Sequence, residues 1–267
     1  MSNLWMNFSR FAAPFSSTLE PDIKKSSMTN EFYKAGEERA ERVGALFATV
    51  ARRYDFINDI QSFGLHRVWK QRVLNLAQAR PGERALDLCC GTGDIALALA
   101  KQGAEVVGLD FSEPMLQVAS EKLKKQPPQA KVEFIRGDAQ QIPFPENTFE
   151  VVTIGYGLRN LADLDAGLRD MLRVTKPGGR MIALEFGKPD NSIWRAIYFG
   201  YLKFFLPIFG KIFCGNSAAY AYILESLKHY PAQKVVAEKL AGLGWQNIKV
   251  INLIGGIMSI HSAEKRK

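Results

Sequence analysis

The segment at residues 85–94, ALDLCCGTGD, constrains the fold of this chain more than any other part of the sequence. A short apolar run, as in a buried strand, leads into a turn of small residues, and a helical pattern begins directly after it. Glycine allows the backbone to approach a ligand closely, and the first turn of a helix offers free N–H groups to a polar or anionic group. The segment therefore predicts a strand, a tight turn and a helix, with a ligand site at the turn.

The same alternation continues through the middle of the chain. Predicted strands cover residues 84–89, 105–109, 132–135, 149–154 and 180–185, and predicted helices cover 95–101, 115–124 and 164–174. Strands separated by helices of this length form βαβ units and a parallel sheet. We therefore expect an α/β fold with a doubly wound, mostly parallel, Rossmann-like sheet.

Helical segments are expected on both sides of this alternation. Residues 31–78 carry apolar positions at helical spacing, and residues 190–230 form an aromatic-rich helical insertion. A further helix at 234–243 precedes two closing strands at 248–254 and 257–261. The architecture therefore has N-terminal helices and a helical insertion before the last strands.

The first thirty residues differ from the remainder, which we expect to form one domain over residues 31–267. We interpret residues 1–30 as a disordered extension or a misassigned start, with Met28 as the alternative first residue. Glu20 and Asp22, and the lack of an arginine series, argue against an organellar targeting peptide.

The ligand at the predicted turn can be narrowed from the acidic residues near it. Asp110 follows the second predicted strand, where a carboxylate can accept hydrogen bonds from both hydroxyls of a ribose. The pattern Gly-x-Gly-x-x-Ala at 91–96 also satisfies a loose dinucleotide fingerprint. Asp87, before the glycines, favours S-adenosylmethionine over a nicotinamide cofactor. A nicotinamide-dependent oxidoreductase, a cofactor-binding protein without catalysis and a tight turn without a ligand are the alternatives.

Several motifs together resemble the series found in class I S-adenosylmethionine-dependent methyltransferases. They are DxCxGxG at 87–93, Asp110, Asp138-Ala139 after the third strand, and KPGGR at 176–180. The resemblance implies S-adenosylmethionine as methyl donor, and no metal. It implies cofactor contacts at six positions, Gly91, Thr92, Gly93, Asp110, Asp138 and Ala139.

A second set of motifs resembles the ubiquinone/menaquinone biosynthesis C-methyltransferase family. These motifs are YDxxN at 54–58, SxGxHxxWK at 62–70, CCGTGD at 89–94, GLRN at 157–160 and NLxGG at 252–256. The resemblance extends from about residue 37 to residue 261, and GLRN is its most specific part.

The family resemblance implies a polyprenylated quinol as the acceptor, methylated on a ring carbon. The forms CCGTG and GLDFS at 108–112 look more like the demethylmenaquinone branch. We therefore expect methylation of demethylmenaquinol in menaquinone biosynthesis. The ubiquinone-pathway methoxy-polyprenyl-benzoquinol and a small soluble acceptor are the alternatives, and the prenyl length stays open.

Methylation at carbon requires a nucleophilic ring, which removal of a proton from the ring hydroxyl provides. Arg159 stays protonated and is therefore a candidate to stabilise negative charge rather than a base. Asp94 could orient a proton through water, and His66 is the candidate with a suitable pKa. The alternative for residues 159–160 is a structural clamp of the loop.

Polar residues recur every four positions at Tyr54, Asn58, Ser62 and His66. On a continuous helix they would form one polar stripe, either a solvated face or a lid over the cofactor and the quinol. Gly64 could break that helix.

Composition limits the partners. A net charge of +8 permits an anionic membrane surface. Three cysteines and three histidines without ligand spacing predict a reducing, cytoplasmic setting and no metal site. The Asn/Asp-Pro-Pro-Tyr/Phe motif of many base methylases does not follow the fourth predicted strand, so we expect no nucleic acid partner. An oligomer is compatible with the sequence.

The insertion is aromatic and basic between Trp194 and Phe213, with Lys203 and Lys211 and no acidic residue. One interpretation is a surface that rests on the inner face of a membrane and admits a lipid substrate. The other is an ordinary core helix pair that is broken at Pro207.

Overall fold

The structure of the protein is a computed structural model, and it describes residues 47–48, 51–214 and 218–267. The predicted extension at 1–30 and the helical segment at 31–46 lie outside the described residues. After residues 47–48, the first element is a short 3-10 turn, η2 (Ala51–Arg53).

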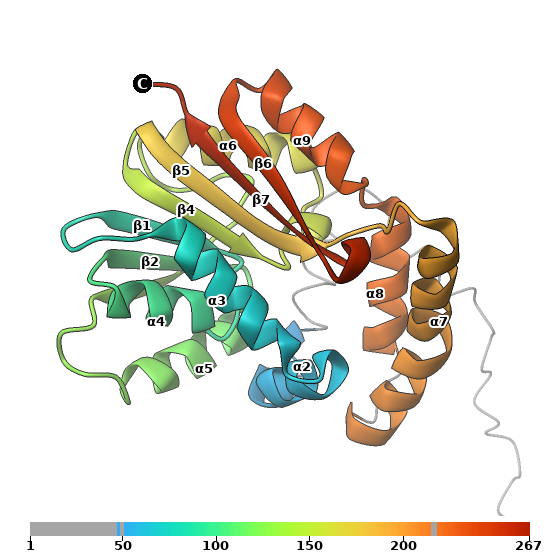
Figure 1. The fold of residues 1–267 in the computed structure, drawn as a ribbon. Helices are drawn as coiled ribbons and strands as arrows, with labels where there is room; N and C mark the ends of the chain where they lie inside the picture. The colour runs from blue at the N-terminus through green and yellow to red at the C-terminus, as the bar shows by residue number, and fades with distance from the viewer. Residues whose placement is uncertain (1–46, 49–50, 215–217) are drawn as a thin grey trace, which may run out of the picture.

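A seven-stranded sheet in the order β3-β2-β1-β4-β5-β7-β6 forms the centre of the molecule (Figure 1). The strands are β1 (Arg84–Leu88), β2 (Glu105–Asp110), β3 (Val132–Arg136), β4 (Phe149–Gly155), β5 (Thr175–Phe186), β6 (Trp245–Leu253) and β7 (Met258–Lys265). Neighbouring strands from β1 to β5 are parallel, whereas β7 lies antiparallel between β5 and β6. The predicted doubly wound, mostly parallel α/β fold is confirmed.

Alternate residues of each central strand face opposite sides of the sheet, and helices cover both sides. Ala85 packs with helices α3 (Leu65–Ala77) and α4 (Asp94–Lys101) in one apolar cluster. Leu86 packs with α6 (Leu164–Val174) and α9 (Gln233–Gly242) in the other. Helix α5 (Glu113–Leu123) contacts β2 and β3 on the α4 side (Figure 1). Burial on both faces explains why these strands are almost continuously apolar in sequence.

The N-terminal helical segment has a break that changes the meaning of its polar stripe. Helix α2 (Tyr54–Ser62) ends at Phe63 and Gly64, which both have left-handed backbone angles, with φ of 51° and 74°. Helix α3 then leaves in a new direction (Figure 1). The four polar residues therefore do not form one continuous helical face, because His66 belongs to the second helix.

The predicted insertion is helical, as expected, but the predicted break inside it is wrong. Helix α7 (Ser192–Cys214) continues through Pro207, and α8 (Ala218–His229) packs against it. Helix α8 also contacts the 3-10 turn η3 (Leu158–Asn160), which follows β4. The insertion and α2 therefore lie beside the carboxyl ends of the parallel strands (Figure 1).

A small third apolar cluster joins these helices to one another. Ile57 of α2 packs with Tyr198 and Leu202 of α7 and with Leu227 of α8. Among the described residues, no helix combines the length and apolar character needed to cross a membrane.

Candidate functional site

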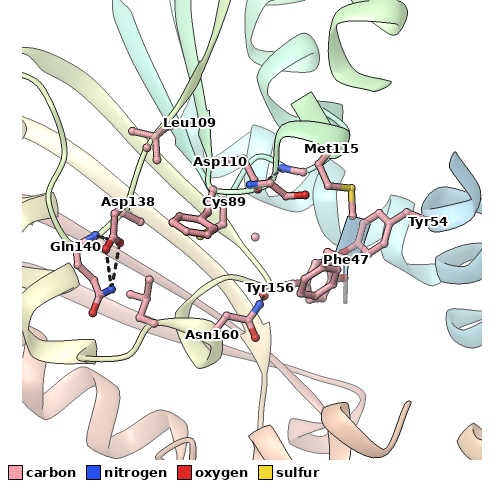
Figure 2. Close-up of a pocket in the computed structure, with 17 residues that line it drawn as sticks. Phe47, Tyr54, Cys89, Leu109, Asp110, Met115, Asp138, Gln140, Tyr156 and Asn160 are labelled. Atoms are coloured by element: carbon pink, nitrogen blue, oxygen red, sulfur yellow. Dashed lines mark hydrogen bonds between the residues drawn. The ribbon is translucent and has the colours of Figure 1, made fainter. Parts of the chain in front are cut away.

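A pocket lies where β1, β2 and β4 end, which is the edge at which parallel α/β sheets bind ligands. It contains about 750 Å³ of empty space including its open mouth. Figure 2 shows Asp138 and Gln140 on one side, with Phe47 and Tyr54 on the opposite side and Tyr156 and Asn160 between them. Its remaining walls are Cys89, Gly91, Leu109, Asp110, Phe111, Ser112, Met115, Gly137, Ala139, Gly155 and Leu161.

Asp110, at the end of β2, is the residue predicted to bind the ribose hydroxyls, and backbone N–H groups hold its carboxylate in place. Its Oδ2 accepts a hydrogen bond from Gly91 N at 2.8 Å, and its Oδ1 accepts one from Ser112 N at 2.8 Å. Burial raises the pKa of this carboxyl, and the backbone donors partly oppose that rise. The carboxylate is thus fixed at the pocket wall with acceptor capacity left for a ligand hydroxyl.

Asp138 and Ala139, beyond β3, also lie on the pocket wall. Asp138 Oδ1 accepts a hydrogen bond from Gln140 N at 2.8 Å, and the Gln140 amide folds back onto the same carboxylate. Leu109 and Leu161 are apolar parts of the same wall. A flat apolar ring with polar edges, such as adenine, suits this side of the pocket.

The turn after β1 is strained at a residue other than glycine. Cys89 has φ of 50°, in the left-handed region that favours glycine. Its side chain occupies space beside Gly157, where an added Cβ would come within 2.7 Å of Cys89 Cβ. Gly157 and Cys89 therefore fit each other, and the pair explains how the loop accepts a cysteine.

Two predicted cofactor contacts on this loop face away from the pocket wall. Thr92 Oγ1 donates a hydrogen bond to Asp55 Oδ1 at 2.7 Å and accepts one from Lys122 Nζ at 3.0 Å. Gly93 packs tightly, because a Cβ there would meet the Phe134 ring at 2.8 Å. Of the loop positions predicted to touch the cofactor, only Gly91 lines the pocket.

Asp94 belongs to the same polar network and not to the pocket. Its two oxygens bind Lys70 Nζ and Lys122 Nζ, each at 2.7 Å. Burial raises the pKa of Asp94, but the two lysines outweigh burial and hold it at about 2. A carboxylate paired with two ammonium groups is a poor proton carrier near neutral pH, so the prediction that Asp94 handles a proton at the acceptor finds no support in this geometry.

His66 is equally far from the predicted role. It is buried at the start of α3, where its Nε2 lies 2.8 Å from Asp59 Oδ1, and it does not line the pocket. Burial lowers the pKa of this imidazole and Asp59 partly opposes the change. Asp59 of α2 also binds Arg67 of α3. His66 and Arg67 therefore join the two helices through one carboxylate.

Arg159 forms a buried ion pair directly behind the pocket wall. Its Nη1 donates to Glu185 Oε1 at 2.6 Å, and its backbone N donates to Glu185 Oε2 at 3.1 Å. The Arg159 Nη1 and Asn160 Nδ2 atoms also donate to the carbonyl oxygen of Tyr156, at 2.7 and 3.2 Å. The GLRN element therefore clamps the loop after β4, as its structural interpretation predicted, and Asn160 carries that clamp onto the pocket wall.

Asp87 does not reach the pocket. It accepts hydrogen bonds from Ala96 N at 3.0 Å and from Thr153 Oγ1 at 2.8 Å, which connect β1 to α4 and β4. Burial raises the pKa of Asp87 to about 7, against both hydrogen bonds. Its role here is to hold the turn in place.

On the aromatic side of the pocket, sequence reasoning missed Phe47 and Tyr156, whereas Tyr54 belonged to the stripe interpreted as a solvated face or a lid over the cofactor. Phe47 and Tyr54 meet with ring centroids 5.9 Å apart and close the side opposite Asp138 (Figure 2). Tyr156 has φ of 61° and lies between two glycines. The flanking glycines were the available signal for Tyr156, whereas the placement of Phe47 depends on tertiary packing. Among the described residues, no cluster of three metal-binding side chains occurs.

Comparison with known proteins gives one consistent result at the level of sequence. A model of the ubiE/COQ5 methyltransferase family matches residues 34–265. The ubiquinone/menaquinone biosynthesis C-methyltransferase UbiE of Azotobacter vinelandii is 38% identical, over 91% of this chain and 99% of the relative. The demethylmenaquinone methyltransferase of Staphylococcus aureus strain JH9 is 39% identical, over 88% of this chain and 96% of the relative.

Solved structures share the fold at low identity. The phosphoethanolamine N-methyltransferase 2 of Haemonchus contortus, in complex with S-adenosyl-L-methionine, matches with a TM-score of 0.58 and 17% identity, over 74% of this chain and 52% of that chain. A Thermotoga maritima S-adenosylmethionine-dependent methyltransferase matches with a TM-score of 0.55 and 17% identity, over 83% of this chain and 100% of that chain.

Proposed function

This chain belongs to the ubiE/COQ5 methyltransferase family, and we propose that it methylates a ring carbon of a polyprenylated quinol, with demethylmenaquinol as its acceptor. The protein is an S-adenosylmethionine-dependent methyltransferase. Menaquinone chemistry is common to the names of both types of relative, UbiE and demethylmenaquinone methyltransferase. The ubiquinone-pathway benzoquinol is the second candidate, because one of those names includes it.

The pair of carboxylates at successive strand ends carries the cofactor part of this proposal. Asp110 and Asp138 follow β2 and β3, and both line one pocket with Gly91. A Cβ on Gly91 would meet no atom within 4 Å, so this part of the loop is open to a ligand. The residues fit S-adenosylmethionine, with Asp110 on the ribose and the Asp138–Ala139 side on the adenine. When bound, this cofactor supplies an electrophilic methyl group on its sulfonium.

On the acceptor side, the residues must favour negative charge on the ring oxygen while the carbon reacts. The Arg159 guanidinium stays protonated and lies behind Tyr156 and Asn160 of the pocket wall. We assign to Arg159 the electrostatic stabilisation of the phenolate, and to Asp94 the attachment of the N-terminal helices to the cofactor loop. We do not assign to His66 the removal of the proton from the ring hydroxyl, because His66 binds Asp59 away from the pocket.

A lipid-tailed acceptor also requires access from a membrane, and apolar side chains gather at one end of the molecule. We define the apolar rim as Phe56, Phe63, Leu65, Phe204 and Phe205, all exposed residues of α2, α3 and α7 and the turn between the first two. Phe63 is 80% exposed. Tyr201 Oη donates to Gln61 O at 3.3 Å and connects the two halves of the rim. Apolar side chains with Lys203 beside them suit the interface of an anionic bilayer.

The proposed reaction is tested by methyl transfer from labelled S-adenosylmethionine, with demethylmenaquinol and the ubiquinone-pathway benzoquinol offered separately in detergent. Label in the naphthoquinol alone supports the proposal, and label in both defines an enzyme of both pathways. If neither accepts label while a small soluble acceptor does, the quinol proposal is wrong and the family assignment is unaffected.

The proposed membrane contact is tested by sedimentation with vesicles that contain anionic lipid. The Phe63→Glu/Phe204→Glu variant is expected to bind at least about tenfold more weakly. In the wild type, insertion of each of these two apolar side chains into the bilayer should be worth roughly 1.5–3 kcal/mol. Val235→Glu on α9 is the matched control, since Val235 is also exposed but lies outside the rim. Equal binding of all three proteins would contradict the membrane contact.

A further inference from the structure

Three tyrosine hydroxyls are buried without a hydrogen-bond partner among the described residues, and they come from three separate elements. Tyr156 follows β4, Tyr198 is on α7, and Tyr230 follows α8. Tyr198 and Tyr230 are each only 4% exposed. A phenol that is removed from water without a partner destabilises the fold, so buried hydroxyls of this kind are normally paired. Among the buried atoms without a partner, these three are the phenols, which a ligand with donor and acceptor oxygens could pair with.

Two of the three side chains, Tyr156 and Tyr198, are placed near the Arg159–Glu185 ion pair through Phe186. The Tyr156 ring lies 5.7 Å from the Phe186 ring, and the Arg159 guanidinium lies 4.7 Å from the same ring. Phe186 also packs against the cluster that contains Tyr198. The charges of Arg159 and Glu185 both act on the hydroxyls of Tyr156, Tyr198 and Tyr230. The three phenols therefore share one electrostatic environment.

This environment adjoins the cofactor pocket. Tyr156 and Asn160 line that pocket, and Asn160 is also bonded to the carbonyl oxygen of Tyr156. The α8 helix, which leads into Tyr230, contacts η3, the turn that carries Arg159 and Asn160. Tyr156 therefore lies between the cofactor pocket and the helical insertion, where Tyr198 and Tyr230 are buried.

Resting on the proposed function, we propose that Tyr156, Tyr198 and Tyr230 bind the two ring oxygens of a hydroquinone acceptor, with Glu185 as a positioning residue that holds Arg159 beside them. A hydroquinone has two hydroxyl groups on opposite sides of its ring, and each can both donate and accept. Burial raises the pKa of all three tyrosines above the usual value, so they stay neutral and hold the acceptor by hydrogen bonds instead of removing its proton. An acceptor whose oxygens are masked as methyl ethers cannot donate to them.

The test compares binding of naphthohydroquinone, kept reduced, with binding of its dimethyl ether, in the full chain with S-adenosylhomocysteine present. Wild type is expected to prefer the hydroquinone. Tyr198→Phe and Tyr230→Phe are each expected to weaken hydroquinone binding about tenfold, or about 1.4 kcal/mol, and to weaken ether binding by a smaller factor, because an ether oxygen can accept a hydrogen bond but cannot donate one. Because Phe removes only a hydroxyl that has no hydrogen-bond partner in the described part of the chain, the melting temperature is expected to stay equal or to rise.

Tyr201→Phe is the matched control. Tyr201 lies on the same helix as Tyr198, but its hydroxyl donates to Gln61 O and is only half-buried. This variant is expected to keep wild-type preference for the hydroquinone. Binding of S-adenosylmethionine is expected to be unchanged in all three variants, because none of the three altered side chains lines the cofactor pocket.

The inference and the proposed function fail in different ways. If wild type binds the ether as well as the hydroquinone, or if Tyr198→Phe and Tyr230→Phe keep the wild-type preference, the tyrosine site is overturned even when quinol is methylated. If the preference exists and both variants lose it, the tyrosine site stands even when no quinol is methylated, and only the proposed reaction falls.

Discussion

The cofactor pocket and the tyrosine site beside it, here called the cofactor side and the acceptor side, are built in opposite ways. On the cofactor side, the Asp110 carboxylate is already bonded by backbone donors from Gly91 and Ser112. On the acceptor side, the hydroxyls of Tyr198 and Tyr230 are buried and have no such partner among the described residues. The cofactor side is thus preorganised by its own loops, whereas the acceptor side depends on a ligand to complete its hydrogen bonds. Preorganisation suits a cofactor that must be held in one geometry for methyl transfer.

A polar network joins the N-terminal helices to the cofactor loop. Lys122 of α5 binds Asp55 at the start of α2 and Asp94 at the start of α4, and Lys70 of α3 binds Asp94 as well. Thr92 bonds to both Asp55 and Lys122. Because Asp55 belongs to this network, its neighbour Tyr54 is held at the pocket wall. The position of the N-terminal helices is coupled to the cofactor loop by these contacts.

The largest expected effect comes from breaking the ion pair between the two sides. Arg159→Met leaves the Glu185 carboxylate buried and uncompensated, and should lower the free energy of unfolding by about 3–5 kcal/mol. Chemical denaturation would measure this loss. The Arg159→Met/Glu185→Gln double variant removes the charge and should recover at least about 2 kcal/mol without recovering methyl transfer. A loss below about 1 kcal/mol in the single variant would contradict a buried ion pair.

The second effect should be confined to the cofactor side. Asp110→Asn replaces a carboxylate that is positioned for the ribose hydroxyls, and the dissociation constant for S-adenosylmethionine should rise about 100-fold, or roughly 2.7 kcal/mol. Calorimetric titration would measure it. The preference for naphthohydroquinone over its ether should be unchanged, since the tyrosine site lies on the other side. If both ligands weaken equally, the two sides do not act independently and the comparison fails.

The last effect concerns the turn beneath the cofactor and depends on pH. The pKa of Asp87 is about 7 in the folded protein, above its value in an unfolded chain, so the folded state binds the extra proton. Its contribution to stability is therefore complete below about pH 4 and is lost as pH rises through about 7, with a slope near 1.4 kcal/mol per pH unit between these limits.

Asp87→Asn isolates this contribution. The difference in free energy of unfolding between wild type and the variant should decrease from about pH 5 to 7 and become constant above that range. Asp94 acts in the opposite direction only at acid pH, because its pKa is lowered to about 2, and both proteins retain it. A difference that does not vary with pH would show that Asp87 is ionised throughout.

Sequence reasoning was most successful where structure is local. Strands β1 to β4 and helix α6 begin and end within one or two residues of their predicted bounds. Asp110 and Asp138 could be assigned to one pocket because parallel strands bring their carboxyl ends to one edge of the sheet. The longer β5 and the antiparallel β7 were less well delimited, since their pairing involves strands far apart in the sequence.

Sequence reasoning failed where a role was assigned from the type of residue alone, without knowledge of the side chains that surround it in space. Asp94 and His66 are suitable types for proton transfer, but Lys70, Lys122 and Asp59 bind them outside the pocket. Those partners lie on other helices or beyond a helix break, so no local pattern reveals them.

By itself, the sequence determined the α/β class, the glycine turn and the acidic residues at the strand ends. Each of these depends on a few consecutive residues and on the spacing at which apolar residues recur. The tertiary structure alone decided that α7 and α8 bring Tyr198 and Tyr230 to the charges of Arg159 and Glu185. It also decided that Phe63 and Phe204 are both left exposed. These relations arise from packing between distant segments, and packing depends on the shapes of both partners and not on the spacing of residues within one of them.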